Sequence, residues 1–272
     1  MIRKVIMLAM VIGGMALLHG CSDKGSSEPS TVLEDGKLSL PGKISAKATP
    51  IPKFGEIAHI PDKKSKFFTY LQKRIEKAND YVWAEREFVL GYREKLKAGT
   101  VGDSEQKQFT QLVTRYKLNG STYQTDEDFD ALLLRVDVVP ASLVLAQGAN
   151  ESAWGTSRFA TEGKNFFGIW CYSKGCGLKP KRANTGTSHE VRKFETVQGG
   201  VSFYVHNLNI GHAYDSLRAQ RAELRSDSKN LSGVKLATGL VRYSERGIAY
   251  VEEIQEMIEH NDLSAYNKIR SF

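Results

Sequence analysis

One glutamate in this sequence has neighbours that suit proton transfer. Glu151 lies in the run LAQGANESAWGTSRF, beside Ala149, Ala153 and Trp154, which are poor choices for a solvated surface. At the end of a helix, the partial negative charge of the helix terminus disfavours a carboxylate, and an adjacent Trp can desolvate it. Both effects raise the pKa of the carboxyl group. We therefore interpret Glu151 as a general acid, against the alternative of a solvated surface residue.

The elements before Glu151 are expected to be helices. Apolar residues recur at three-, four- and seven-residue spacings from Asp62 to Leu96 and predict one long amphipathic helix. Asp103 with Gln106 resembles a capping box that opens a second helix, which runs to Tyr116. Thr125 with Asp128 is expected to cap a third helix, 129–136.

Glu151 itself belongs to a fourth predicted helix. Pro140 suits its first position, and Gly155 breaks it, so Glu151 falls in its last turn. Turn-forming and basic residues dominate 170–194, where we expect a small β-hairpin lobe. The remaining predicted helices are 196–207, 213–224, 231–240 and 248–260. The expected fold class is α+β, mostly α.

Two runs carry a resemblance to a known family. The run from Leu145 to Phe159, followed by NFFGIW at 165–170, resembles glycoside hydrolase family 73, the lysozyme-like β-N-acetylglucosaminidases. VSFYVHNL at 201–208, followed by Ala213 and Tyr214, is similar to its aromatic helix and Tyr. With the additional N-terminal helices, the motifs resemble the Bax proteins of Gram-negative bacteria. The resemblance implies a lysozyme-like fold and hydrolysis of the β-1,4 bond after N-acetylglucosamine in peptidoglycan, with no cofactor and no metal.

The resemblance also implies roles for particular residues. Glu151 would be the acid, and the Tyr214 hydroxyl would help to place the N-acetyl group or the attacking water. Asn165 would offer amide hydrogen bonds in a cleft wall to which Phe166 and Trp170 contribute aromatic faces, and Trp154 is a further candidate for binding substrate. The alternative is that these aromatic side chains belong to the hydrophobic core.

A second catalytic carboxylate is harder to place. Members of the family commonly carry a second Glu in the β-lobe, yet the stretch LKPKRANTGT has no carboxylate. Of the two nearby acids, Glu190 is the better candidate and Glu195 the other. Alternatively, Glu190 faces solvent and the 2-acetamido group of the substrate assists the displacement.

The N-terminus resembles an export signal. Residues 1–20 combine basic Arg3 and Lys4 with a short apolar stretch, and the run LLHGC resembles a bacterial lipobox that would place a lipid on Cys21. Ser22 after that Cys favours the outer membrane, facing the periplasm. Residues 21–61 are expected to be a flexible tether. The alternative is a signal peptide that is removed without lipidation.

The two other cysteines and the charge add weaker indications. Cys171 and Cys176 are expected to form a disulfide, since exported thiols tend to pair; two free thiols or half a metal site are the alternatives. The net charge of +7 is spread along the chain, which suits an anionic partner or an ordinary basic surface. No basic-aromatic RNA signature or DNA-binding motif is recognisable, so nucleic acid is not expected as a partner.

The predicted organisation therefore has four parts: a signal peptide (1–20), a tether (21–61), an N-terminal helical extension (62–124) and a catalytic domain (125–272), in a monomer. Two other functions compete with the glucosaminidase hypothesis. One is a wall-binding lipoprotein that has lost turnover. The other is a muramidase or lytic transglycosylase with the same fold.

Overall fold

The computed structural model describes residues 33–34, 37–38, 49–118, 123–180, 189–227 and 230–268. The predicted signal peptide, the lipidation site at Cys21 and most of the predicted tether lie outside these residues. Within the described ranges, no helix has the combination of length and apolar character that is needed to cross a bilayer.

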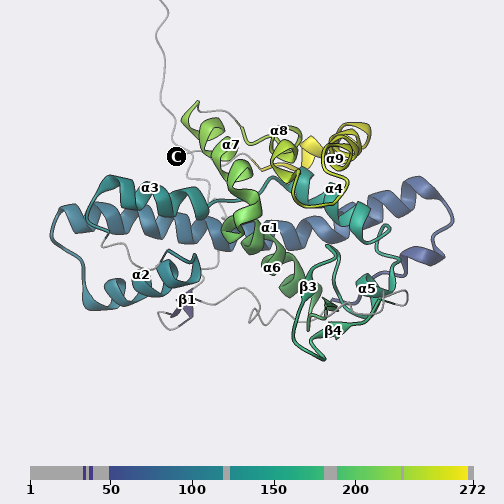
Figure 1. Ribbon diagram of the computed structural model, residues 1–272, viewed down its shortest axis with the longest axis horizontal. Coiled ribbons are helices and arrows are strands. Elements are labelled where there is room, and N and C mark those ends of the chain that lie inside the picture. The colour runs from purple at the N-terminus through teal and green to yellow at the C-terminus, as the bar shows by residue number, and fades with distance from the viewer. Residues whose placement is uncertain are drawn as a thin grey trace, which may run out of the picture. The chain divides into compact units, whose positions relative to one another are not determined.

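Helices dominate the structure, and a small sheet interrupts them (Figure 1). The α-helices are α1 (Ile60–Lys97), α2 (Asp103–Arg115), α3 (Asp126–Arg135), α4 (Ala141–Glu151), α5 (Arg158–Thr161), α6 (Val197–Ile210), α7 (Asp215–Ser226), α8 (Gly233–Ala237) and α9 (Ile248–His260). The 3-10 helices are η1 (Phe54–Glu56), η2 (His212–Tyr214), η3 (Thr238–Leu240) and η4 (Leu263–Tyr266). The strands are β1 (Leu33–Glu34), β2 (Lys37–Leu38), β3 (Trp170–Cys171), β4 (Gly177–Leu178) and β5 (Glu190–Arg192).

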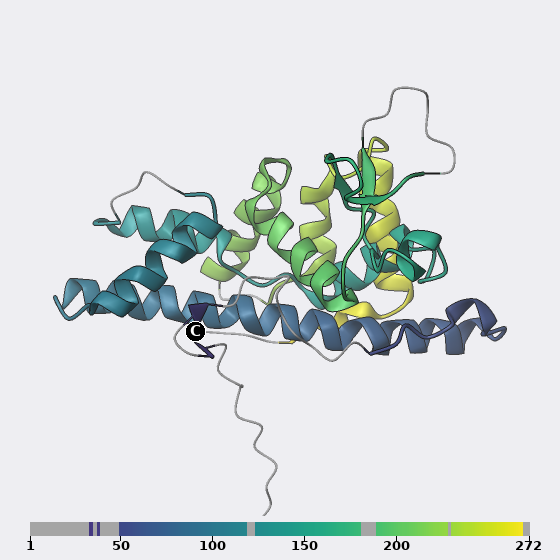
Figure 2. The same cartoon turned by 90° about the horizontal axis from the view of Figure 1, so that it is seen from below.

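The long helix α1 belongs to two separate hydrophobic clusters. Its N-terminal half contributes Phe67, Leu71 and Ile75 to the larger cluster, together with α4, α6 and α9. Its C-terminal half contributes Val89 and Tyr92 to a smaller cluster with α2 and α3. In Figure 2, α1 runs beneath both groups of helices. The first half of the predicted N-terminal extension is therefore part of the main core.

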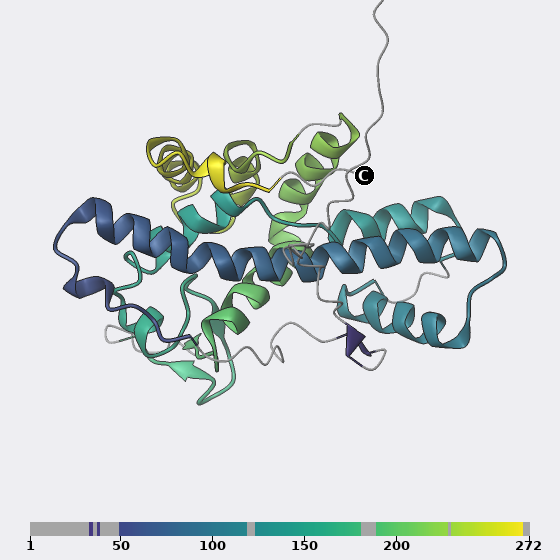
Figure 3. The same ribbon diagram turned by 180° about the vertical axis from the view of Figure 1, so that it is seen from behind.

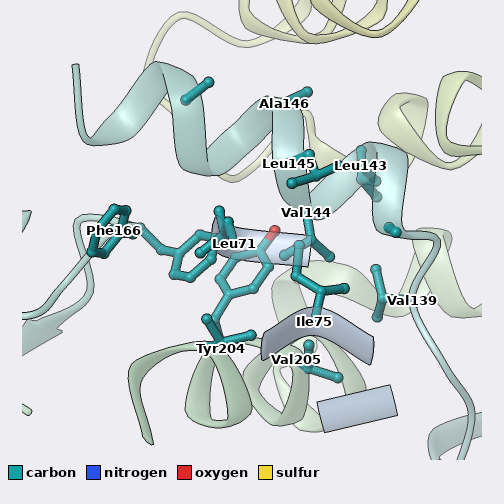
Figure 4. Close-up of a cluster of buried hydrophobic side chains, with 14 of the residues drawn as sticks. Leu71, Ile75, Val139, Leu143, Val144, Leu145, Ala146, Phe166, Tyr204 and Val205 are labelled. Atoms are coloured by element: carbon teal, nitrogen blue, oxygen red, sulfur yellow. The ribbon is translucent and has the colours of Figure 1, made fainter. Parts of the chain in front are cut away.

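The main core surrounds α4. Every residue from Ala141 to Ala149 is buried, which explains why this helix is apolar on all sides rather than on one face. Figure 4 shows Leu71 and Ile75 of α1, Val144 of α4 and Tyr204 of α6 in this cluster. The segment before α1 joins the core as well, because Phe54 is only 1% exposed.

The predicted β-hairpin lobe is a three-stranded antiparallel sheet in the order β3-β5-β4. Trp170 pairs with Val191 and Cys171 with Glu190, while Leu178 pairs with Val191 from the other side. The sheet agrees with the expected α+β, mostly α fold class. The strands β3, β4 and β5 all lie within 170–194, where the sequence predicted the lobe.

Several helix boundaries differ from the prediction by one to three residues. Helix α2 is preceded by Gly102, whose N–H donates to the Glu105 carboxylate, so the predicted box of Asp103 and Gln106 is one residue out of register. Pro140 precedes the first residue of α4 instead of occupying it. The predicted cap of α3 is correct, since the Thr125 side chain accepts from the Asp128 N–H.

A buried ionic network joins the α3–α4 connection to α7. The Asp137 side chain is 3% exposed and lies 3.0 Å from Arg225 and 3.8 Å from both Arg86 and Arg221. Burial opposes ionisation of Asp137, but these guanidinium groups more than compensate and lower its pKa. Burial likewise lowers the pKa of Arg221, to about 10. The network stabilises the fold only while Asp137 is charged.

We expect Asp137→Asn to lower the free energy of unfolding at pH 7 by about 3 kcal/mol, because it leaves buried guanidinium charge without its counter-ion. The pKa of Asp137 is lower in the folded state, so this contribution exists above the unfolded-state pKa and is lost as the pH falls through the folded-state value. Urea unfolding at several pH values measures it. The control is Asp130→Asn, an exposed partner of Arg93, for which the change should stay below about 0.5 kcal/mol; equal effects would contradict the prediction.

Candidate active site

Glu151 ends the buried helix α4, and the turn after it is held by Ser152. The Ser152 hydroxyl donates to Gly148 O at 2.5 Å and accepts from the Gly155 N–H at 2.7 Å. The Trp154 N–H donates to Ala149 O at 2.9 Å. The chain therefore reverses directly after the glutamate, which leaves the carboxyl group at the boundary between core and surface.

This turn contains three successive residues in the left-handed region. Ala153, Trp154 and Gly155 have φ of 49°, 58° and 76°. A side chain at Gly155 would also collide with the Phe54 ring, because its Cβ would lie 2.5 Å from that ring. The Gly of the ESAWG run is thus required both by its backbone conformation and by the close approach of the segment before α1.

The NFFGIW run forms a second turn beside Glu151. The Asn165 amide holds this turn, with Oδ1 accepting from the N–H groups of Phe167 and Ile169 and Nδ2 donating to the carbonyls of Ile169 and Arg192. Gly168 has φ of 62°, and a Cβ there would lie 3.4 Å from Glu151 Oε2. The glycine thus allows the turn to approach the carboxyl group closely.

Helix α9 contributes the direct partner of the carboxyl group. The Tyr250 hydroxyl donates to Glu151 Oε1 at 2.9 Å and accepts from Gln147 Nε2 at 3.0 Å. The Tyr204 hydroxyl donates in turn to Gln147 Oε1. Tyr204, Gln147, Tyr250 and Glu151 thereby form a continuous chain of hydrogen bonds from α6 through α4 and α9.

Further tyrosines complete the surroundings of Glu151. Tyr243 stacks on Tyr250, with ring centroids 5.4 Å apart, and donates to Phe167 O at 2.7 Å. Tyr214 lies 6.2 Å from Tyr243, centroid to centroid, and is 9% exposed. Burial raises the pKa of the Tyr214 hydroxyl, and the nearby Glu151 charge adds to this effect. The structure therefore places the predicted Tyr214 and Glu151 in one neighbourhood.

Burial is the main reason that the pKa of Glu151 is raised. The hydrogen bond from Tyr250 lowers that pKa, the negative charge of Glu253 raises it, and the positive charge of Arg246 lowers it again. Glu253 and Arg246 form an ion pair at 2.7 Å. The net result is a carboxyl group that keeps its proton to higher pH than an exposed glutamate, as general acid catalysis requires.

Neither Tyr250, the partner of Glu151 on α9, nor Tyr204 of α6, which acts through Gln147, was predicted from the sequence. One signal was present for Tyr250: it stands one residue before Val251 and four before Ile254 on the buried face of α9. A buried tyrosine hydroxyl usually has a hydrogen-bond partner. The sequence shows that such a partner is needed, but not which residue supplies it.

Three predicted substrate-binding residues lie away from solvent or face another element. Phe166 is fully buried and packs against Phe67 of α1, so it is a core residue. Asn165 is 1% exposed and uses its amide for the backbone hydrogen bonds of the turn. The Trp154 ring packs on Phe67 and Phe68, at 5.6 and 5.4 Å between centroids. These positions differ from the expected cleft wall, because the Phe166 and Trp154 rings pack against aromatic side chains of α1.

Trp170, in contrast, is accessible. It is 52% exposed, stacks on His189 at 4.0 Å between ring centroids, and is followed by Tyr172, which is 73% exposed. Exposed aromatic faces of this kind suit sugar rings. Its predicted role in binding substrate remains a prediction.

Glu190 lies within the sheet, next to the cysteines. Its two carboxylate oxygens accept from the N–H groups of Gly175 and Gly177, at 3.2 and 2.8 Å. These hydrogen bonds lower its pKa. The structure joins Cys171 and Cys176 in a disulfide, and sulfur atoms bonded to each other are not the thiolates that a metal ion requires. Glu190 thus holds the disulfide loop in place, and a role as base remains untested.

Residues 126–263 match the glucosaminidase family, which is described as mannosyl-glycoprotein endo-beta-N-acetylglucosaminidase. The chain is also similar to Protein bax of Escherichia coli strain K12, with 30% identity over 217 residues, which cover 80% of this chain and 76% of that protein. No solved structure matches the chain.

Two substitutions are expected to shift the pKa of Glu151 in opposite directions. Tyr250→Phe removes the hydrogen bond to the carboxylate and should raise the pKa, whereas Glu253→Gln removes a nearby negative charge and should lower it. Carbon-13 NMR titration of labelled glutamate side chains measures both shifts. Glu252→Gln is the control, an exposed residue next to Glu253. Shifts of the same sign in the two variants would refute this account of the site.

Proposed function

Because the chain belongs to the glucosaminidase family, we propose that it is a peptidoglycan hydrolase that cleaves the β-1,4 bond after N-acetylglucosamine, with Glu151 as the general acid. The observation that carries the proposal is the half-buried Glu151 carboxyl group, whose pKa is raised, at the end of α4. A glycosidase needs such an acid, because the departing sugar oxygen must receive a proton as the glycosidic bond breaks.

In the first step, Glu151 donates its proton to the glycosidic oxygen and becomes a carboxylate. Tyr250 remains hydrogen-bonded to Glu151 Oε1 and stabilises the developing charge, while Oε2 lies on the side of Gly168. Trp170 and Tyr172 supply exposed aromatic faces for sugar rings. The hydrogen bonds from Gln147 and Tyr204 hold Tyr250 in position throughout.

Breaking the glycosidic bond also requires a nucleophile at the anomeric carbon. Both oxygens of Glu190 accept from backbone N–H groups, and a lowered pKa makes it a weak base. The 2-acetamido group of the substrate fits this role better: its oxygen attacks the anomeric carbon as the bond to the leaving group breaks. In the second step, water opens the ring so formed and gives its proton to the Glu151 carboxylate. Tyr214, close to Glu151, is suited to orient the acetamido group or that water.

The test is digestion of purified sacculi by protein that lacks residues 1–21. We expect new N-acetylglucosamine reducing ends, and Glu151→Gln should lower the rate about 100-fold or more, because a general acid contributes roughly 10² to 10⁴ in rate. Mass spectrometry of the reduced fragments identifies the ends. Glu259→Gln, which removes an exposed carboxylate on α9, serves as the control and should retain activity.

Each other outcome contradicts the proposal in a specific way. New N-acetylmuramic acid ends would indicate a muramidase, and 1,6-anhydro ends would indicate a lytic transglycosylase. Equal release by Glu151→Gln and the unchanged protein would remove Glu151 as the acid. Binding to sacculi without release of fragments by either protein would support a wall-binding lipoprotein.

We propose further that the protein is exported and anchored by lipid at Cys21, with the catalytic part facing the periplasm. The support is the run LLHGC after a basic and apolar N-terminus. Growth with a radiolabelled fatty acid should label the unchanged protein, and Cys21→Ser should abolish the label. Cys171→Ser with Cys176→Ser is the control and should keep it. A label that is absent from the unchanged protein would refute lipidation.

A further inference from the structure

A hollow of about 960 Å³ lies along the N-terminal half of α1, apart from the residues that contact Glu151. Its walls are α1, residues 49–52 and the start of α6. Figure 3 shows α1 in front of the other helices of the main core. We call this hollow the α1 groove. Glu151, Tyr250, Gln147 and Tyr204 do not line it.

The α1 groove is strongly basic. Its cationic lining residues are Lys66, Lys73, Arg74, Lys77 and Lys164, and Asp62 is the acidic residue among those that line it. Lys66, Lys73 and Lys77 are spaced seven and four residues apart, so they share one face of the helix. The row from Lys66 to Lys77 spans about 16 Å, at 1.5 Å per residue. The groove thus presents an extended row of positive charge.

The N-terminus of α6 adds to the positive electrostatic potential of the groove. Thr196, Val197 and Gln198, at the first turn of a 14-residue helix, line the groove. N–H groups in a first turn, together with the positive end of the helix dipole, favour a negative ligand. The Gln198 amide donates to Arg74 O at 2.9 Å and so joins the two walls. The lysine row and the helix end are therefore held in one site.

Tyr70 lies between these cations and adds an aromatic ring to the wall of the groove. It lines the groove, is 8% exposed and carries the Arg74 guanidinium over its ring at 3.6 Å. Its hydroxyl is buried and has no hydrogen-bond partner among the described residues. Because the hydroxyl oxygen itself is buried, a ligand in the groove contacts the Tyr70 ring and the Arg74 guanidinium above it, and not the hydroxyl.

From these features we propose that the α1 groove binds the acidic peptide stems of peptidoglycan, an inference that rests on the proposed function. Stems are slender chains with carboxylates separated by small apolar side chains. The groove matches them, since cations spaced along its length alternate with Tyr70, Ile51 and Val197. A single phosphate would instead favour cations that converge on one point. The groove would therefore hold the peptide while the active site engages the glycan.

The experiment titrates a fluorescent synthetic stem tetrapeptide with free carboxylates into the full catalytic chain, residues 22–272, carrying Glu151→Gln so that nothing is cleaved. We expect Lys66→Glu with Lys73→Glu to weaken binding about tenfold or more, a change of about 1.4 kcal/mol. The same peptide with amidated carboxylates should bind weakly to either protein. Lys107→Glu with Lys235→Glu, two exposed lysines outside the groove, is the matched control of equal charge change and should bind normally.

Circular dichroism and the melting temperature confirm that both double variants fold. Equal affinity for the free and amidated peptides, or equal affinity of the groove and control variants, would overturn the proposal. The proposal would also be overturned if the groove variant lost its binding to vesicles that contain anionic phospholipid but bound the peptide with unchanged affinity. Peptide binding does not depend on turnover. A chain that binds the stem but releases no fragments from sacculi would therefore refute the proposed function and leave this inference standing.

Discussion

The position of one carboxyl group at the end of a fully buried helix is the constraint on which the site depends. Helix α4 is surrounded by α1, α8, α9 and η4, so Glu151 leaves the core only in its last turn. Partial burial there destabilises the carboxylate and keeps the proton on the acid. This placement requires two tight turns beside the Glu151 side chain. One is the turn held by Ser152, which contains Gly155, and the other contains Gly168.

The tyrosine cluster around Glu151 partly offsets the effect of burial on the carboxylate. Without a hydrogen-bond donor, the Glu151 carboxylate would be strongly disfavoured after proton transfer. The Tyr250 hydroxyl donates to it and lowers its pKa, whereas the negative charge of Glu253 raises that pKa. The chain through Gln147 to Tyr204 fixes the direction of that hydroxyl. Aromatic stacking of Tyr243 on Tyr250 limits the movement of the ring. The acid is therefore set in a rigid, mostly apolar surrounding that favours directed proton donation.

Helix α1 links parts that the sequence suggests are separate. Its first half packs in the same core as α4, and its second half carries α2 and α3. The buried network around Asp137 ties the connection between α3 and α4 to α7 through Arg221 and Arg225. The extension is thus joined to the catalytic part by the packing of α1 in the main core and by the ion pair of Arg86 with Asp137.

The sequence by itself determined most helices and the α+β class, and it indicated Glu151 as the candidate acid, because periodicity, caps and the ESAWG run are local properties of the chain. Only the tertiary structure decided which aromatic side chains face the core: Trp154 and Phe166 meet Phe67 of α1, which lies 87 and 99 residues earlier in the chain. It likewise decided the partners of Glu151, since Tyr250 and Gly168 reach it from distant segments. Such contacts depend on how helices pack, and no spacing within one helix encodes them.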